Sequence, residues 1–390
     1  MELCSSAAYE AEIAWLRERC LQLNRDSQPV IMHSPGNSVP HSMDLPSQGA
    51  SSGFRDGRIR YEPEFRFMLT RHWTLMNSML HSRYVATRLG VWRDRGKRLL
   101  ETFIVKMGLP LAQVRIDYSS MTAELKESLP LRICKYAAEF GFEDVSFPSF
   151  VREHGYVMRL SASDAVYALM ALLEAPYTAA MMDSSSVNTS STSGFPNWVQ
   201  NFYYTYDALD AQKAEKLQQG IQLAKRQQQV ILHEATTILS HRSMRYGRRF
   251  RYVVLRHSAD LAWLSNHPLS LGKLALFLLD ATRTSRKGHL PLVLAAYQKA
   301  KDTFLVVATV AMQKAQEQAE GTDRHLEEPR NKYFLLLLIL FSQFGQAFRK
   351  AAQLIRARVK HDGFESSMIE VKAEDLKAFL QTLQMVTNSS

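Results

Sequence analysis

The sequence is poor in cysteine and contains no recognisable cysteine pair. Its three cysteines, Cys4, Cys20 and Cys134, lie far apart in a chain of 390 residues. Proteins that depend on disulfide bonds usually carry many cysteines in a short chain. The pattern therefore argues against a disulfide framework and indicates a reducing compartment.

The sequence also lacks a long hydrophobic run. The longest one, YFLLLLILF at residues 333–341, is about half of what a bilayer-spanning helix needs, and it is most simply a buried strand. The first residues include Glu2 and Glu10 and show no apolar core typical of a secretory signal. We therefore expect an intracellular protein with no membrane partner.

Motifs that identify common enzymes are missing as well. The sequence has no P-loop, no GxGxxG, no HExxH and no CxxC, and its 12 histidines are scattered. Metal-dependent phosphoesterases need clustered carboxylates and imidazoles to hold two cations roughly 3.5–4 Å apart. Local spacing offers no such cluster, so we assign no catalytic residue, no metal ligand and no cofactor. A site assembled from distant residues stays open as an alternative.

What the chain does have is enough apolar material for a folded protein of two or three domains. Hydrophobic residues make up 46% of the sequence and aromatic residues 10%. The formal net charge of +10 permits contact with nucleic acid or with an acidic protein. Because many proteins carry as much charge, its placement along the chain is more informative than its total.

Composition divides the chain into four parts. Residues 1–26 contain a short amphipathic helix, and residues 27–59, rich in Ser, Pro and Gly, form a flexible linker. Residues 60–245 predict an all-helical domain interrupted by a polar loop at 181–196, and residues 246–390 predict a small α/β domain. The predicted fold class is α+β, predominantly helical.

Apolar spacing places the helices of the middle part. It predicts a helix whose inward face carries Leu69, Trp73, Met76 and Leu80, and another whose inward face carries Leu99, Leu100, Phe103, Ile104 and Met107. A third helix is expected to begin at Ser161 or Ser163, to bury Val166, Leu169, Met170 and Leu173, and to end before Pro176. A long helix follows, and one of its faces carries Leu217, Ile221, Ala224, Ile231, Ala235 and Ile238, with the polar Gln228 among them. We expect this helix to bridge two domains, or, as the alternative, to form a coiled-coil dimer.

The C-terminal part alternates strands and helices. Strands are predicted at residues 250–256, 290–296, 303–310 and 368–371, which are short and rich in Val and Leu. Helices are predicted at residues 269–281, 344–358 and 374–385.

An arginine tract at residues 83–98 is the best candidate site. It combines six basic residues with interleaved aromatic rings, and guanidinium groups bind phosphates or carboxylates through paired hydrogen bonds. The alternative is a solvated helix face whose aromatic residues point into the core. The residues we assign to partner or DNA binding from this region are Trp73, Arg83, Tyr84, Arg88, Trp92, Arg93 and Arg98.

A second basic cluster, RSMRYGRRFR, occupies residues 242–251 just before the first predicted strand. Arg248 and Arg249 are its candidate binding residues, in a loop that could contact phosphates. The cluster equally suits solvated charges that keep an edge strand from pairing with another chain.

Several blocks, in a fixed order, resemble the cell division control protein 45 family over most of residues 60–386. The blocks are HWTLMNSM (72–79), SRYVATRLGVW (82–92), GKRLLETFIVKMGLPL (96–111), ASD (162–164), LLEAP (172–176), GIQLAKRQQ (220–228), FGQAFRKAA (344–352) and MIEVKAEDLKAFL (368–380). The resemblance starts near the end of the family's phosphoesterase-like N-terminal half, so we expect that half to be missing. The family pattern has no apolar run before FGQAFRKAA, and we expect the run at 333–343 to reflect an imperfect gene model.

The resemblance implies a function as well as a fold. The family is similar to RecJ-type phosphoesterases without their catalytic residues, and it acts at replication origins and forks. It implies a nuclear, non-enzymatic scaffold with a DHH-associated-type C-terminal domain, whose partners are the MCM helicase ring, the GINS complex, and DNA as origin chromatin and single strands. A RecJ-type phosphoesterase and a stand-alone single-stranded DNA-binding module are the alternatives.

Overall fold

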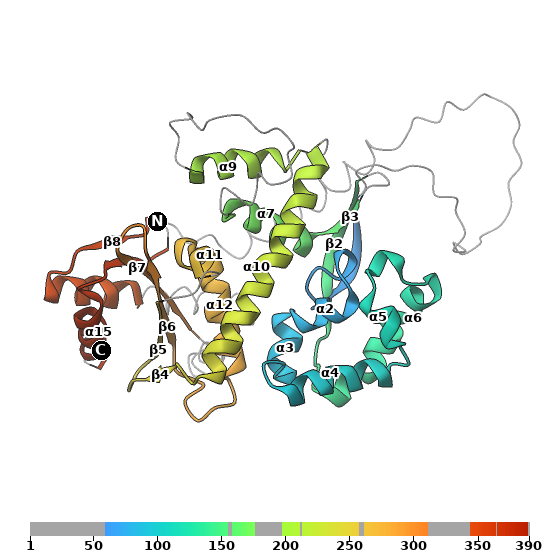
Figure 1. Cartoon of the computed structure of the whole chain (residues 1–390), viewed down its shortest axis with the longest axis horizontal. Coiled ribbons are helices and arrows are strands. Elements are labelled where there is room, and N and C mark those ends of the chain that lie inside the picture. Colours follow the sequence, from blue (N-terminus) through green and yellow to red (C-terminus); the bar gives the residue numbers. More distant parts are fainter. Residues whose placement is uncertain are drawn as a thin grey trace, which may run out of the picture.

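The computed structural model describes residues 59–154, 158–175, 197–210, 213–256, 261–310, 344–363 and 365–388. The predicted helix and linker at 1–58, the loop at 181–196 and the apolar run at 333–343 lie outside these residues. The chain is a mixed α/β protein, as predicted. In Figure 1 a long helix, α10 (Ala214–Ser240), runs between a mainly helical part and a C-terminal part built on a sheet.

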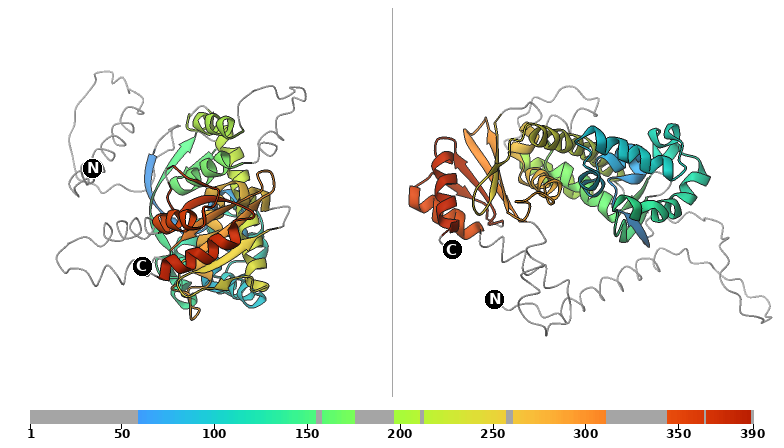
Figure 2. Two further views of the ribbon diagram at one scale, coloured as in Figure 1. Left: turned by 90° about the vertical axis from the view of Figure 1, so that its left-hand side faces the viewer. Right: turned by 90° about the horizontal axis from the view of Figure 1, so that it is seen from below.

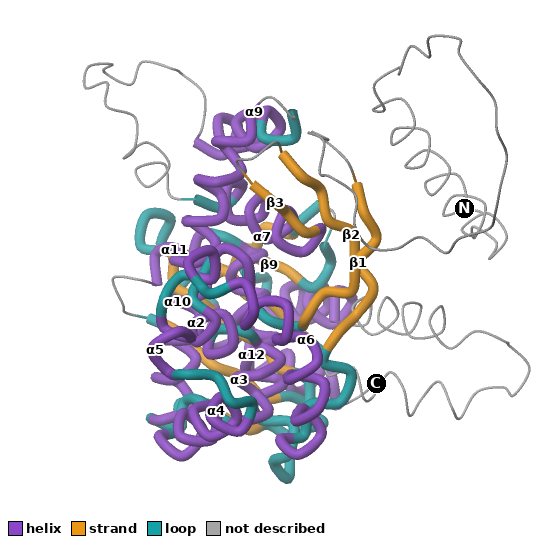
Figure 3. Tube along the Cα trace, turned by 90° about the vertical axis from the view of Figure 1, so that its right-hand side faces the viewer, coloured by secondary structure: helices purple, strands orange, loops and turns teal. Residues whose placement is uncertain are grey.

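A three-stranded antiparallel sheet interrupts the part that the sequence predicts to be all helical. Its strands are β1 (Ile59–Phe65), β2 (Ser146–His154) and β3 (Met158–Ser161), in that order. Figure 3 shows them together beside the helices. The all-helical prediction is wrong here because β1 and β2 carry proline, which usually marks a non-strand. Pro63 faces Pro148 across the pair, so the missing amides fall at one register position.

Short helices follow β1. They are η1 (Thr70–His72), α2 (Leu75–Leu80), α3 (Arg83–Leu89), α4 (Asp94–Lys106), α5 (Leu111–Arg115), η2 (Tyr118–Ser120), α6 (Ala123–Ala137) and η3 (Ala138–Phe140). The predicted continuous helix from Leu69 to Leu80 is broken, because Leu69 has φ of 50° and Trp73 is extended. Thr74 then caps α2 by accepting a hydrogen bond from the Asn77 amide. The predicted inward face of α4 is confirmed except at Leu99, which is 36% exposed.

Helix α7 (Ala162–Leu173) packs against α10 and against α9 (Asn197–Asp207), which lies at the upper edge of the molecule in Figure 1. Of the two predicted caps, Ser161 is the one that caps α7. The predicted inward face is wrong at Val166 and Leu173, which are 53% and 36% exposed, and the helix buries Ala168, Ala171 and Leu172 instead. The predicted apolar face of α10 is buried throughout, against α7 and α12 (Pro268–Ala281) of the same chain. The helix is therefore a bridge, and its apolar face is not available for a coiled-coil dimer.

The C-terminal sheet has the strand order β4-β5-β6-β7-β9-β8. Its strands are β4 (Arg245–Tyr246), β5 (Arg251–Leu255), β6 (Leu292–Gln298), β7 (Thr303–Thr309), β8 (Val359–His361) and β9 (Met368–Lys372), and only the β5–β6 pair is parallel. The four predicted strands are confirmed as β5, β6, β7 and β9. The helix predicted at 269–281 is α12, the helix predicted at 344–358 covers residues 344–355, and the last is α15 (Leu376–Asn388).

Helices cover both faces of this sheet. Alternate residues of β6 and β7 pack on α11 (Leu261–Asn266) and α12 on one face, and on residues 344–355 and α15 on the other. Figure 1 shows the sheet edge-on between the two helix layers, and the left view of Figure 2 looks onto the α15 side. One core cluster extends from this sheet through α12 and α10 into the helical part. Continuous packing thus holds the two parts together.

Candidate functional site

Helix α3 carries the first two arginines of the tract, Arg83 and Arg88, into a cleft between the two parts of the molecule. Its N-cap, Ser82, donates its hydroxyl hydrogen to the Arg66 carbonyl at 2.6 Å, and Gly90 ends the helix with φ of 70°, a conformation that favours glycine. Val85, Ala86 and Leu89 are buried. The opposite face of the helix therefore presents the predicted residues Arg83 and Arg88 to solvent.

The cleft has a volume of about 1310 Å³. One wall comes from residues 65–93 and 141–147, and the other from α7, α10, α12 and the residues after α12. Small-molecule pockets usually have volumes of about 300–1,000 Å³. Of the predicted binding residues, five line the cleft: Arg83, Tyr84, Arg88, Trp92 and Arg93.

Two contacts join the walls. The Arg83 Nε lies 3.1 Å from the Asp280 Oδ2 on α12, and both side chains are about half exposed. The Trp92 ring meets the edge of the Phe277 ring, with 6.4 Å between centroids. The two parts of the chain are therefore in direct contact along α3 and α12, and the cleft opens beside this contact.

Aromatic rings hold the guanidinium groups of the first wall. The Arg88 Cζ lies 3.8 Å from the centre of the Tyr84 ring, and the Arg66 Cζ lies 5.8 Å from that ring and 5.5 Å from the Phe147 ring. The Tyr84 hydroxyl donates to the Glu143 carbonyl, which fixes the ring. Burial raises the pKa of Tyr84, opposed by the charge of Arg88, so this hydroxyl stays protonated as a donor.

The lining of the cleft is basic overall. It includes six cations (Arg66, Arg83, Arg88, Arg93, Lys273 and Arg283) and three carboxylates (Glu143, Asp144 and Asp280), an excess of three positive charges. Burial lowers the pKa of Lys273 to about 8, and the charge of Glu174 opposes part of this fall. Lys273 is therefore mostly charged at neutral pH. The arrangement suits an anionic ligand.

The remaining predicted residues lie elsewhere. Trp73 is 6% exposed and stacks on His81, with 4.6 Å between ring centroids, so its ring is part of the core and is not available for the partner or DNA binding to which we assigned it. Arg98 is exposed on α4 but does not line the cleft. Arg248 and Arg249 are exposed in the turn between β4 and β5, where β4 is the edge strand of the sheet.

Arg251, from the same basic cluster, is fully buried. Its guanidinium donates to the carbonyls of Gly288 and Leu290 and to the Thr282 hydroxyl, and so ties β5 to the segment after α12. The prediction of a solvated cluster is wrong at this residue, because main-chain carbonyls satisfy the guanidinium in place of water.

Sequence reasoning missed the polar residues that join α7, α10 and α12. Glu174, in the LLEAP block, accepts hydrogen bonds from the amides of Leu269 and Ser270, each at 2.7 Å, and from the Ser270 hydroxyl. It thereby caps the first turn of α12. Burial raises the pKa of Glu174, and the Ser270 hydroxyl opposes that rise. Gln227 donates to the Ser270 hydroxyl at 2.6 Å and accepts from Lys273 at 2.8 Å.

Gln228 is the one member of this junction that the sequence pattern indicated. It interrupts the apolar face of α10, and its amide donates to the His81 carbonyl at 2.9 Å, in the turn between α2 and α3. A buried amide among apolar positions signals such a partner, although the pattern does not identify it.

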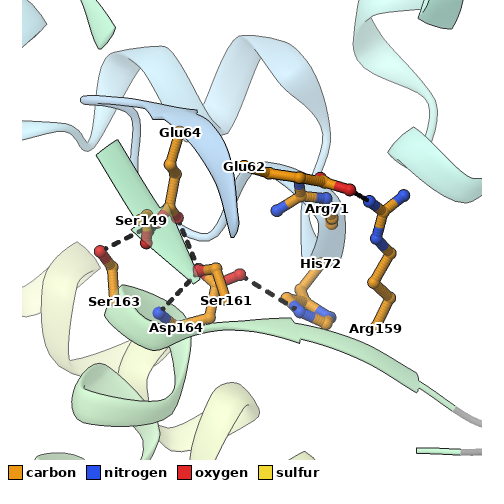
Figure 4. Close-up of polar contacts among 9 residues, drawn as sticks. All are labelled: Glu62, Glu64, Arg71, His72, Ser149, Arg159, Ser161, Ser163 and Asp164. Carbon is orange, nitrogen blue, oxygen red and sulfur yellow. Dashed lines mark hydrogen bonds and ion pairs between the residues drawn. The ribbon is translucent and has the colours of Figure 1, made fainter. Parts of the chain in front are cut away.

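A second polar cluster surrounds Glu64 on β1 (Figure 4). Its carboxylate accepts hydrogen bonds from Ser161 at 2.6 Å, Ser149 at 2.9 Å and Ser163 at 3.1 Å. Burial raises the pKa of Glu64, and the hydroxyl of Ser161 gives the largest opposing contribution. The cluster joins the small sheet to the N-terminus of α7.

The same cluster contains the residue types of a hydrolase triad without its geometry. His72 Nε2 lies 3.5 Å from the Asp164 Oδ2 (Figure 4). The hydroxyls of Ser161 and Ser163 donate to Glu64 and not to His72, so the imidazole activates neither as a nucleophile. We interpret this cluster as structural.

The residues that the structure describes contain no group of three or more His, Cys, Asp or Glu side chains arranged to hold a metal ion. Among the described helices, none combines the length and apolar composition needed to cross a lipid bilayer.

Comparisons with known proteins place the chain in a family. The CDC45 family model matches residues 2–386. The chain is 35% identical over 349 residues to the cell division control protein 45 homologue of Schizosaccharomyces pombe, covering 85% of this chain and 52% of that protein. It is 31% identical over 346 residues to cell division control protein 45 of Saccharomyces cerevisiae, covering 84% and 51%.

The fold agrees with a solved structure. The crystal structure of CDC45 from Entamoeba histolytica matches with a TM-score of 0.59 and 24% identity, covering 84% of this chain and 58% of that one. The chain spans about half the length of the curated relatives it matches. The match of the family model along nearly the whole sequence shows that this chain belongs to the CDC45 family.

Proposed function

We propose that this protein is a non-catalytic scaffold subunit of the replicative helicase, acting in the initiation of DNA replication and in unwinding at the fork. In this role it joins the MCM ring to the GINS complex in the nucleus, on origin chromatin, and contacts single-stranded DNA. Membership of the CDC45 family, a family of replication initiation factors, supports the replication role. The bridging role and the partners are our proposal.

The observation that carries the bridging role is the presence of two surfaces suited to partners rather than to solvent. One is the basic cleft. The other is the aromatic face of α9, where Trp198 is 70%, Phe202 52%, Tyr203 64% and Tyr206 65% exposed. Trp, Tyr and Arg are the residues most enriched at the energetic centres of protein interfaces. Two such surfaces on different elements suit a subunit that binds more than one partner.

Co-purification tests the proposal. Tagged chain, mixed with recombinant MCM and GINS, should retain both, and replacing Trp198, Phe202 and Tyr206 together by Ser should weaken retention of one of them. Leu131→Ser is the control, because Leu131 is a large apolar residue of α6 that is 76% exposed. Failure of the unaltered chain to retain either complex, or manganese-dependent release of nucleotides from single strands, would contradict the scaffold role.

A further inference from the structure

The cleft contains cations that have no carboxylate partner. Arg83 is paired with Asp280, but among the described residues no carboxylate lies within 4 Å of the guanidinium groups of Arg88 or Arg93. Aromatic rings hold these two groups instead: Arg88 on Tyr84 at 3.8 Å, and Arg93 near Trp92 at 5.9 Å. Two guanidinium groups therefore lie along the wall of the cleft without a carboxylate in direct contact, although Asp280, which pairs with Arg83, also feels the charge of Arg88.

The aromatic rings that contact the arginines have part of their surface covered by those contacts. A base of single-stranded nucleic acid binds by stacking on a free aromatic face. The face of Tyr84 carries Arg88, and its hydroxyl is bonded to the Glu143 carbonyl. Trp92 meets the edge of Phe277 and lies near Arg93. The aromatic residues of this wall thus support cations and are poorly placed to stack on bases.

The contact across the cleft shows which ligand chemistry the walls accept. The carboxylate of Asp280, on α12, pairs with Arg83 on α3 at 3.1 Å. A guanidinium group binds a carboxylate through paired hydrogen bonds, and a flat aromatic neighbour fixes the plane of the guanidinium for that purpose. The excess of three positive charges is also modest for a strand that carries one phosphate per nucleotide. A volume of about 1310 Å³ exceeds that of a typical small-molecule site and suits a segment of polypeptide.

We infer that the cleft between α3 and α12 binds an extended acidic segment of a partner protein, with the guanidinium groups of Arg88 and Arg93 pairing with Asp or Glu side chains of that segment. The inference rests on the proposed scaffold function and names the chemistry of one of its contacts. Tyr84 is a positioning residue, because its ring holds the Arg88 guanidinium in the orientation in which that group binds a carboxylate of the segment.

Fluorescence anisotropy on the full chain tests the inference with two labelled probes. One is a 12-residue peptide of alternating Glu and Gly, and the other is an oligothymidylate of 12 nucleotides. Arg88→Gln with Arg93→Gln should weaken binding of the peptide by about ten-fold or more. The matched control is Arg95→Gln with Lys97→Gln, which removes the same charge from exposed residues of α4 that do not line the cleft, and it should change affinity by less than about two-fold.

A third variant separates positioning from charge. Tyr84→Leu keeps every charge of the cleft but removes the ring under Arg88, so peptide affinity should fall while the dependence of affinity on salt keeps its slope. Circular dichroism of each variant shows that it is folded.

Two results would overturn the inference. In one, the cleft and control double variants lose peptide affinity equally; in the other, the oligothymidylate binds more tightly than the peptide and loses affinity with the cleft variant. Either result, with MCM and GINS still retained by the unaltered chain, removes the inference and leaves the proposed function standing. If the unaltered chain binds the peptide but retains neither MCM nor GINS, the proposed function is contradicted and the inference about the cleft is not.

Discussion

Replacing Glu174 by Ala should separate the helical part of the molecule from the C-terminal part more than any single change on the surface. Glu174 lies at the end of α7 and is 5% exposed, and its carboxylate accepts from the Leu269 amide, the Ser270 amide and the Ser270 hydroxyl. These donors belong to the first turn of α12, whose own N-cap residue, His267, makes no side-chain capping bond.

The magnitude follows from the donors that the substitution leaves unpaired. Each buried donor without an acceptor costs about 1 kcal/mol or more, so three donors cost about 3 kcal/mol. Part of this is recovered, because burial raises the pKa of Glu174 and the folded protein therefore disfavours its charged form. We expect the free energy of unfolding to fall by about 2 kcal/mol.

Urea denaturation followed by circular dichroism measures this change, with Glu127→Ala as the control, since Glu127 is exposed on α6. Hydrogen exchange should accelerate at the amides of Leu269 and Ser270 in the Glu174 variant before it does elsewhere in α12. A difference of less than about 0.5 kcal/mol between the two variants, the range of ordinary surface substitutions, would refute this prediction.

Three further predictions concern residues that are buried or partly buried. Burial lowers the pKa of His267 from 6.5 to about 4, so the unfolded chain takes up the proton at a higher pH than the folded protein does. The free energy of unfolding should therefore fall by about 2 kcal/mol, discounted for partial exposure, as the pH drops from 6.5 to 4, and His267→Gln should lack this pH-dependent loss in denaturation experiments across that range. Arg251→Met should lower the free energy of unfolding by about 3 kcal/mol in urea titrations. Arg251→Lys should not restore stability, because one ammonium cannot reach the same three acceptors, and full stability of that variant would refute this prediction. Gly220→Ala should destabilise the protein by about 1–3 kcal/mol, although alanine has the better helix propensity, because the new Cβ would lie 2.8 Å from the Ala168 carbonyl oxygen. A higher melting temperature of this variant in thermal unfolding would contradict the prediction.

Local signals in the sequence predicted much of the fold. The Ser161 cap and the apolar period of α10 each depend on neighbouring residues only, and each agrees with the structure. The small sheet was missed because β1 carries Pro63, a residue that usually argues against a strand, and because its one buried residue is the charged Glu64. Its pairing with β2, more than 80 residues away, is a long-range contact that local pattern does not encode.

The candidate site was predictable only in part, for the same reason. The position of Arg83, Arg88 and Arg93 along one helical tract marked the first wall of the cleft. Its second wall, with Lys273 and Asp280, comes from a helix about 190 residues further along the chain, and no local pattern relates the two. We assigned Trp73 to binding because it lies near the arginine tract in the sequence, but its stacking on His81 places it in the core.

The central claim is that this chain functions by holding partners together. Sedimentation velocity of the purified chain with equimolar MCM and GINS tests it most directly. A bridging subunit should give one faster-sedimenting species that contains all three components and that is absent when the chain is omitted. Separate boundaries for MCM, GINS and the chain, at concentrations where each is intact, would contradict it.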